Sequence, residues 1–200
     1  MTSVAARTTV NTEAVRDAAL TLFSERGYHG TALSQVAEML GIRTPSLYNH
    51  MRSKQELLRG IVGETTDKVW EDYEVAIAGI DDVVEQLRRA TEIYALRHAT
   101  HRREALIVNR DLASLDEPAR SQVLDKRRRH ERAVRQLIAA GTEQGVFTVR
   151  QPVLASFAIL EMCVSIARWF REDGPMSAAD VARQYSDFAL QLAGATPPPR

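Results

Sequence analysis

One stretch constrains the fold more than any other: residues 31–57, TALSQVAEMLGIRTPSLYNHMRSKQEL. It opens with Thr31, a residue type that serves well as an N-cap, and apolar side chains then recur at helical spacing from Leu33 to Leu40. Gly41 follows, and glycine readily adopts the left-handed conformation of a helix C-terminus. These signals predict a short helix with one buried face, capped by Thr31 and ended at Gly41.

A second start signal comes a few residues later. Thr44 offers a side-chain oxygen as N-cap, and Pro45 suits the first helical position because the N–H that proline lacks would have no partner there. The predicted second helix runs from Pro45 to Met51, after a turn formed by residues 41–43. A three-residue turn containing glycine between two short helices is the spacing of a helix-turn-helix.

This second helix has two different faces. Leu47 and Met51 lie four positions apart and predict a buried side that holds the short helix in place. The other side chains are small or able to hydrogen-bond: asparagine can bond adenine twice, serine and threonine suit base edges or phosphates, and a tyrosine hydroxyl suits a phosphate. The predicted DNA contacts on this helix are Thr44, Pro45, Ser46, Tyr48, Asn49 and His50.

The next helix begins with a pattern that favours phosphate binding. Ser53 and Glu56 have the spacing of a capping box, and Lys54 lies at the same helix end. Free N–H groups, the positive end of the helix dipole and a lysine would together bind a phosphate. Lys54 is therefore a further predicted DNA contact.

A family resemblance rests on residues in fixed order and without gaps: Phe23, Gly27, Tyr28, Thr31, Ala37, Gly41, Pro45, Leu47, Tyr48, His50, Ser53, Lys54 and Leu57. This set is similar to the N-terminal DNA-binding signature of the TetR family of transcriptional repressors. The resemblance implies an all-α homodimer in which residues 45–51 enter the major groove and a larger C-terminal domain binds a small-molecule inducer. It adds Thr31 and Ser34 to the expected DNA-binding residues.

Three positions depart from the family's pattern. Ser34 stands where many members carry a basic side chain near the DNA, Ala32 replaces a common threonine, and Met51 replaces a common phenylalanine. The electrostatic pattern adds little support, since residues 1–54 hold six basic and four acidic side chains, a balance of only +2, in a chain of zero net charge. The prediction of DNA binding therefore depends on motif geometry.

Composition predicts an intracellular protein. The 44% of apolar residues suffice for a proper core, and the single cysteine, Cys163, excludes an internal disulfide and fits a reducing cytoplasm. The N-terminal sequence MTSVAARTTVN lacks the apolar segment of a signal peptide. We therefore expect a cytoplasmic protein.

The remaining pattern is helical throughout. Residues 12–26 predict a helix behind the helix-turn-helix, and residues 53–77 predict a long connector; further helices are expected at about 82–99, 103–112, 116–144, 153–170 and 177–193. The predicted organisation is a flexible arm at 1–10, a helix-turn-helix DNA-binding domain at 11–55, a ligand-binding and dimerisation domain at 56–195 and a disordered tail at 196–200. Within the arm, Arg7 could approach the minor groove, although a frayed terminus is the simpler interpretation.

The segment 153–170 is the most apolar in the chain. Eighteen residues interrupted by Glu161 and Arg168 argue against a membrane span. A helix that is apolar on nearly every side predicts contact with a second copy of the chain as well as with the core. With the last helix it would form a four-helix interface about a two-fold axis, which implies a palindromic operator. The predicted interface residues are Val164, Trp169, Val181, Tyr185, Phe188 and Leu192.

Short motifs in the C-terminal half, including residues 109–111 and 141–147, resemble family members that respond to fatty acyl-CoA or steroid-derived acyl-CoA thioesters. An acyl chain requires an apolar tunnel, and a CoA head requires cations such as Arg110, Arg127 or Arg128. Glu161, in its apolar helix, is expected to be buried and to need a partner, with an arginine slightly favoured over a ligand. The candidate ligand-binding residues are Tyr73, Tyr94, Asn109, Arg110, Arg128, Phe157, Glu161, Met162 and Ile166.

Other function classes receive less support. The chain has no phosphate loop, no GxSxG and no cysteine with a plausible base, so an enzyme is not expected and neither is a cofactor. His98 and His101 could share a metal, but further ligands are not near them in sequence. A helical protein-interaction adaptor is a distant alternative. Within the regulator hypothesis, a lipophilic drug or aromatic inducer is the alternative, and an aromatic content of only 6% favours the acyl-CoA.

Overall fold

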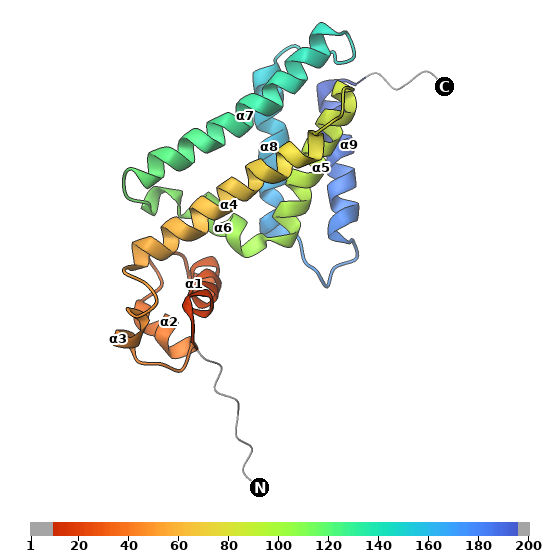
Figure 1. Cartoon of the computed structure of the whole chain (residues 1–200). Helices are drawn as coiled ribbons and strands as arrows, with labels where there is room; N and C mark the ends of the chain where they lie inside the picture. Colours follow the sequence, from red (N-terminus) through yellow and green to blue (C-terminus); the bar gives the residue numbers. More distant parts are fainter. Residues whose placement is uncertain (1–9, 196–200) are drawn as a thin grey trace.

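The computed structural model describes residues 10–195, which fold into α-helices and one short 3-10 helix, with no strand in that range. The all-α class predicted from the sequence is confirmed. The elements are α1 (Thr12–Arg26), α2 (Leu33–Met39), α3 (Thr44–Leu47), α4 (Lys54–Ile77), α5 (Val83–Thr100), α6 (Arg102–Arg110), η1 (Leu112–Ser114), α7 (Ala119–Glu143), α8 (Pro152–Trp169) and α9 (Ala178–Ala193). Figure 1 shows α1–α3 gathered at one end, with the longer helices forming the rest of the molecule.

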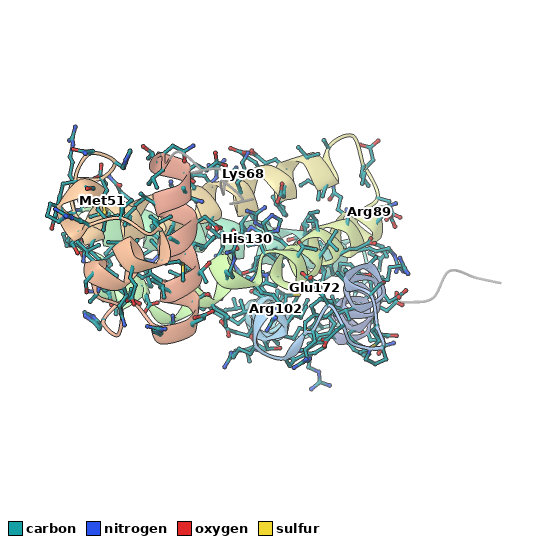
Figure 2. The ribbon with its side chains drawn as sticks, turned by 90° about the horizontal axis from the view of Figure 1, so that it is seen from below. Met51, Lys68, Arg89, Arg102, His130 and Glu172 are labelled. Carbon is teal, nitrogen blue, oxygen red and sulfur yellow. The ribbon has the colours of Figure 1, made fainter. Side chains whose placement is uncertain are left out.

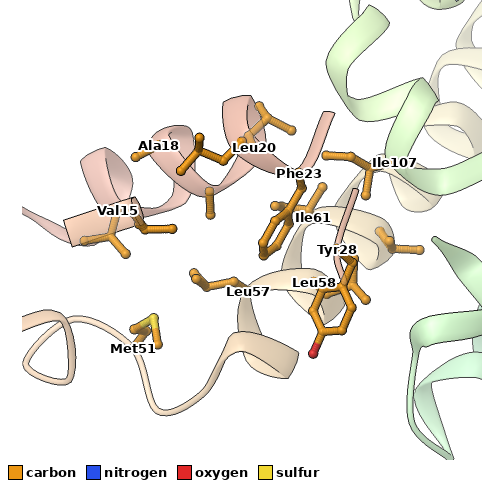
Figure 3. Packing of buried hydrophobic residues seen from close by; sticks show 14 of the residues in the cluster. Val15, Ala18, Leu20, Phe23, Tyr28, Met51, Leu57, Leu58, Ile61 and Ile107 are labelled. Carbon is orange, nitrogen blue, oxygen red and sulfur yellow. The ribbon is translucent and has the colours of Figure 1, made fainter. Parts of the chain in front are cut away.

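The helix-turn-helix region has its own apolar core. Leu22 and Phe23 of α1, Val36 of α2 and Leu47 of α3 are at most 2% exposed and meet the first turns of α4. Figure 3 shows part of this core, in which Phe23 of α1, Ile61 of α4 and Ile107 of α6 approach one another. Because α6 belongs to the C-terminal half of the chain, this core is not confined to the N-terminal helices.

Helix α4 belongs to both halves of the molecule. Its residues Leu58 and Ile61 are fully buried in the N-terminal core, whereas Tyr73 and the partly buried Trp70 pack in a second cluster with α5, α7 and α8. In Figure 1 it runs from the end that carries α3 to the opposite end of the molecule. A domain boundary near residue 55 therefore falls where the helix begins, and its first turns complete the N-terminal core.

Helix α5 lies at the centre of the C-terminal half, against α9, α8, α4 and α7. Helix α8 is long and apolar enough to cross a membrane by length and composition, with a mean hydropathy of 1.4 over 18 residues, and 39% of it is buried inside the fold. Its buried side includes Ile159, Cys163 and Ile166, which pack in the two C-terminal clusters. Its opposite side is exposed in the single chain.

The long helices lie within a few residues of their predicted bounds, but three predictions about the helix-turn-helix are wrong in detail. Thr31 does not cap α2, which starts at Leu33 after Ala32. Thr44 is the first residue of α3, so the cap position falls on Arg43. Helix α3 itself ends at Leu47, although hydrogen bonds three and four residues apart continue the helical turns as far as Met51.

The start of α4 follows the prediction in part. The Ser53 hydroxyl accepts a hydrogen bond from the backbone N–H of Glu56 at 3.1 Å, as an N-cap should. The carboxylate of Glu56 accepts from the N–H of Arg52 instead of Ser53, so the capping box is displaced by one residue. The predicted arm, with Arg7, and the tail at 196–200 lie outside the described residues, apart from position 10 of the arm.

Candidate DNA-binding surface and effector cavity

Helix α3 and the turn after it present most of the predicted side chains to solvent. Leu47 is fully buried and Met51 is 5% exposed, so the predicted inward face is confirmed. Tyr48 is 56% exposed, and Pro45 and Asn49 are exposed beside it. Thr44, Ser46 and His50 are partly exposed on the same segment, and Ser34 is exposed on α2. This surface can offer hydroxyl, amide and imidazole groups to base edges and phosphates.

Two arginines outside the predicted DNA-binding set flank this surface. Arg43 precedes α3 and Arg52 follows its last turn, and both are exposed. Neither forms an ion pair with another residue in the 10–195 range. Their place in the turns on either side of the outward-facing segment was visible in the sequence. They place positive charge beside this surface, although the net charge of the whole chain is zero.

The structure contradicts the prediction that Thr31 contacts DNA. Its side chain is 2% exposed, and its hydroxyl donates hydrogen bonds to the carbonyl oxygens of Gly27 at 2.9 Å and Leu22 at 3.2 Å. The Thr31 hydroxyl thus provides a donor for carbonyl oxygens near the end of α1, and this contact positions the start of α2. Its role is to hold the helix-turn-helix together from inside.

Lys54 is also turned inward. Its ammonium donates a hydrogen bond to the carbonyl oxygen of Tyr28 and lies 4.2 Å from the centre of the Tyr28 ring. Burial lowers the pKa of the Lys54 amine, and the nearby carboxylate of Asp111 opposes that shift. In the chain without DNA this ammonium therefore makes a structural contact between α4 and the residues after α1, and its contact with a phosphate stays a prediction.

A polar junction joins the DNA-binding region to α6. The Arg110 guanidinium donates hydrogen bonds to the carbonyl oxygens of Phe23 and of Ser24, the latter at 3.1 Å, and pairs with Asp111 at 3.0 Å. The Asp111 carboxylate, 5% exposed, accepts a hydrogen bond from the backbone N–H of Tyr28 at 3.3 Å. Arg110 was predicted to bind a ligand. It instead ties the end of α6 to the end of α1.

A cavity of about 240 Å³ lies in the C-terminal half between α4, α5, α6, α7 and α8. Of the predicted ligand-binding residues, Tyr94, Asn109, Arg128, Phe157 and Glu161 line it. In Figure 2, His130, which also lines the cavity, lies in the middle of the molecule between the ends that carry Met51 and Arg89. Residues far apart in the sequence thus meet around one space.

Four other predicted ligand-binding residues do not line the cavity. Tyr73 and Ile166 are each buried in one of the two apolar clusters of the C-terminal half, and Met162 packs against both clusters. Arg110 forms the junction with α1 described above. Conversely, Val164 was expected at a dimer interface but is 6% exposed and lines the cavity. Met162, Val164 and Ile166 lie on α8, and the direction in which each points depends on how α8 is rotated in the bundle, which its nearly uniform apolar pattern does not specify.

Glu161 differs from its prediction as well. It is exposed at the edge of the cavity, although a buried carboxylate was expected. It forms no ion pair with any residue between 10 and 195, so the predicted internal salt bridge to an arginine is wrong. An exposed carboxylate remains hydrated and needs no such partner.

Three histidines line the cavity, the exposed His101 and the buried His98 and His130, and none of them was predicted to bind the effector. His98 is 5% exposed and His130 6% exposed, and burial lowers the pKa of each imidazole to about 4. Both rings are therefore neutral near pH 7. The only signal in the sequence was a histidine on each of two long helices, which is too common a pattern to indicate a shared site.

Four basic side chains line the cavity, and three of them already have acidic partners. Arg97 pairs with Asp72 at 2.6 Å, Lys126 with Asp67 at 2.5 Å, and Arg128 with Asp125 at 2.8 Å. Arg127 is different because its only hydrogen bond within the described chain is to the amide oxygen of Asn109, at 3.4 Å. Its positive charge is available for an anionic group of a ligand.

An exposed apolar strip covers the outer sides of α8 and α9. Trp169 is 43% exposed and its ring stacks on that of the partly buried Tyr185 at 6.3 Å, while Phe188 is 42% and Leu192 38% exposed. Val181, predicted in the same set, is 2% exposed and packs inside the C-terminal core. Four of the six predicted interface residues thus lie together on one accessible face.

Comparisons with known proteins agree with this arrangement. Residues 15–61 match the family profile described as bacterial regulatory proteins of the tetR family, and residues 81–193 match the profile described as tetracyclin repressor-like, C-terminal domain. The chain is 29% identical over 177 residues to the transcriptional repressor KstR2 of Rhodococcus jostii, covering 87% of this chain and 86% of that one.

Solved structures of related proteins have the same fold. The TetR family regulator PfmR of Thermus thermophilus superimposes with a TM-score of 0.79 at 34% identity, covering 88% of this chain and 97% of PfmR. AibR, solved in complex with isovaleryl coenzyme A and operator DNA, superimposes with a TM-score of 0.80 at 23% identity, covering 92% and 99% of the two chains. The chain belongs to the TetR family of transcriptional regulators.

Proposed function

We propose that this protein is a ligand-responsive homodimeric transcriptional repressor that binds a palindromic operator in double-stranded DNA. The observation that supports DNA binding most directly is the outward-facing set on α3 and the following turn, where Tyr48 is 56% exposed beside Asn49. Asn49 would contact a base edge and Tyr48 a phosphate, with Arg43 and Arg52 adding phosphate contacts on either side. The name of the relative KstR2, a transcriptional repressor, supports the same direction of control.

A second copy of the chain is the proposed partner of the strip on α8 and α9. Exposed Trp169, Phe188 and Leu192 form a contiguous apolar face, which is costly to leave in water and suits a symmetric contact. Such a dimer would place its two recognition helices about one DNA turn, roughly 34–36 Å, apart. The two halves of the operator would then be related by the same two-fold symmetry.

The proposed effector is an acyl-CoA thioester. The cavity combines apolar walls, including Val69, Leu160 and Val164, with the guanidinium of Arg127, which can bind a phosphate or pyrophosphate. This pairing of an apolar space and an available cation is what supports the thioester. The complex of AibR with isovaleryl coenzyme A adds an example within the same fold.

A lipophilic drug or aromatic compound is the second candidate effector. Trp70, Tyr94 and Phe157 line the cavity, so an aromatic ring would find ring neighbours there. Such a ligand would not need Arg127. Dependence of binding on that arginine therefore distinguishes the two candidates.

Release from DNA is proposed to pass through α6. This helix lines the cavity with Ala105, Val108 and Asn109, and its C-terminal end is joined to α1 by Arg110 and Asp111. A ligand that favours another position of α6 would displace the DNA-binding region relative to the bundle. Typical coupling of about 1–3 kcal/mol would give a graded response, and a near-complete switch requires about 5.5 kcal/mol.

The test uses the full chain in gel-shift assays with genomic fragments from its own upstream region, with and without isovaleryl-CoA, free CoA or a hydrophobic drug. We expect the thioester to release DNA and to raise the melting temperature, as any ligand of the folded state does. Arg127→Gln should weaken thioester binding about tenfold, whereas Arg132→Gln, on an exposed arginine of the same helix outside the cavity, should not. Thioester binding unaffected by Arg127→Gln would contradict the proposed effector, and a helical adaptor would shift no fragment at all.

A further inference from the structure

Two histidines and a tyrosine form one polar cluster inside a cavity whose surface is mostly apolar. The ring of Tyr94 lies 4.4 Å from that of His98 and 4.9 Å from that of His130, measured between ring centres. All three residues line the cavity, and both histidines are more than nine-tenths buried. The cluster therefore brings hydrogen-bonding groups to a place that water reaches poorly.

The contacts of His98 determine which of its nitrogens carries the proton. Its Nδ1 lies 2.8 Å from the backbone carbonyl oxygen of Tyr94, and a carbonyl oxygen can only accept a hydrogen bond. Nδ1 must therefore be protonated. Because burial lowers the pKa of His98 to about 4, the ring is neutral near pH 7, and Nε2 is left with a lone pair that can accept a hydrogen bond.

The imidazole of His130 differs from that of His98 in its hydrogen bonding. Neither of its ring nitrogens has a hydrogen bond within residues 10–195, although both are buried. Burial lowers its pKa to about 4, so this ring is also neutral and offers one donor and one acceptor. Buried polar groups are paired in nearly all native structures, and the side chain of His130 lines the cavity, so a rotation of its ring would bring the unpaired N–H to a ligand there.

We propose that this cluster binds a hydroxyl group of the effector, which donates a hydrogen bond to Nε2 of His98 and accepts one from the N–H of His130. An alkyl chain would leave both imidazoles unpaired, and a ketone, which only accepts, would leave the lone pair of His98 unpaired. A hydroxyl is the common neutral group that can serve both. A site that hydrogen-bonds this hydroxyl would discriminate against analogues that lack it, because its buried polar groups would then be left unpaired.

This inference rests on the proposed thioester effector and makes it more specific. With Arg127 available for the anionic head, the ligand becomes a hydroxyacyl thioester. The cavity volume of about 240 Å³ is below the range of roughly 300–1,000 Å³ of ligand pockets, so the acyl group is short. A hydroxylated four-carbon acyl group is therefore a suitable probe.

The test is calorimetric titration of the full chain with butyryl-CoA, acetoacetyl-CoA, both enantiomers of 3-hydroxybutyryl-CoA and 4-hydroxybutyryl-CoA. We expect at least one hydroxyacyl thioester to bind about tenfold more tightly than both the alkyl and the oxo analogue. His98→Phe and His130→Phe should each abolish this preference while retaining affinity for butyryl-CoA. His29→Phe, which replaces an exposed histidine between α1 and α2 that does not line the cavity, is the matched control and should leave the preference intact.

The ligand series on the unaltered protein keeps the test independent of whether a variant folds. Thioesters that bind without preference for the hydroxyl would overturn the inference and leave the thioester effector standing. If no thioester binds, thermal shifts with cyclohexanol and cyclohexanone decide. A histidine-dependent preference for the alcohol would support the hydroxyl site and reject the thioester, and equal shifts, or none, would reject both.

Discussion

The carboxylate of Asp111 accepts a hydrogen bond from the backbone N–H of Tyr28 at 3.3 Å, across 83 positions of the chain. Both residues are buried, and Arg110 beside them binds the carbonyl oxygens at the end of α1. The end of α6 is thus held to the end of α1 by polar contacts whose geometry is more demanding than apolar packing. In the proposed mechanism this is where movement of the cavity wall reaches the DNA-binding region.

We expect Asp111→Ala to lower the free energy of unfolding by about 1–3 kcal/mol, because a buried N–H loses its acceptor and Arg110 its counter-charge. Urea denaturation measures this loss. Effector-induced release of DNA should weaken as well, in gel-shift titrations. Asp125→Ala, which breaks an exposed ion pair on α7, is the control and should cost less than about 1 kcal/mol. Equal losses from the two substitutions would argue against a special role for the junction.

Substitutions of Tyr48 and Asn49, the two exposed residues that follow α3, should affect DNA binding in different ways. Tyr48→Phe removes a proposed phosphate contact and should weaken binding to all operator sequences alike. Asn49→Ala removes a proposed base contact, worth about 1–3 kcal/mol, and should change the sequence preference. Competition gel shifts with single-base operator variants measure both effects. If Asn49→Ala weakened every operator variant equally, its assignment to a base would be wrong.

Acid should destabilise this protein over a defined range. Burial lowers the pKa of His98 and of His130 from 6.5 to about 4. Below about pH 6.5 the unfolded chain gains protons that the folded chain does not accept until about pH 4, so stability is complete above this range and falls as the pH decreases through it. The difference of 2.5 units corresponds to about 3 kcal/mol for each histidine. Denaturant midpoints between pH 7 and pH 4 measure the loss.

His130→Phe offers a separate check on the unpaired imidazole. Replacing a buried ring that lacks hydrogen bonds by an apolar ring should raise the free energy of unfolding at pH 7 by about 1 kcal/mol. It should also remove part of the acid sensitivity, because one of the two shifted groups is gone. A His130→Phe protein that is strongly destabilised at pH 7 would show that the ring is satisfied in the folded state.

A charge placed in the strip on α8 and α9 should separate the proposed dimer. Phe188→Asp would place a carboxylate in an apolar contact, and we expect its dissociation constant to rise at least about 100-fold in sedimentation equilibrium. Met176→Asp alters a similarly exposed apolar side chain, in the loop before α9, and serves as the control. An unaltered dimer in Phe188→Asp would place the interface elsewhere.

Helix positions were predictable because their signals are local. Ser53 caps its helix as expected, and Leu47 and Met51 face inward as their spacing requires. The inward turn of Lys54 was not predictable, because it depends on the position of Tyr28, which another segment brings near it. The sequence pattern of a helix N-terminus predicts the position of a residue in the helix, but not which residue from another segment its side chain contacts.

The lining of the cavity was even less predictable from the sequence. Tyr94, Asn109 and Phe157 line it as predicted, yet His98 and His130 come from different helices whose relative rotation no local pattern reveals. Their partners, burial and pKa values depend on that rotation. Helix bounds can thus be predicted from residues a few positions apart, whereas the site depends on contacts between distant segments.

Ile107, Leu115 and Val123 lie in the same apolar cluster as α1, α2 and α3. A fragment ending after the first turns of α4 would expose the surface that these three residues cover. The operator-recognising part of this protein is therefore not a portable module. A chimera that joins it to the sensor half of another regulator would have to carry over α6 and the start of α7 as well.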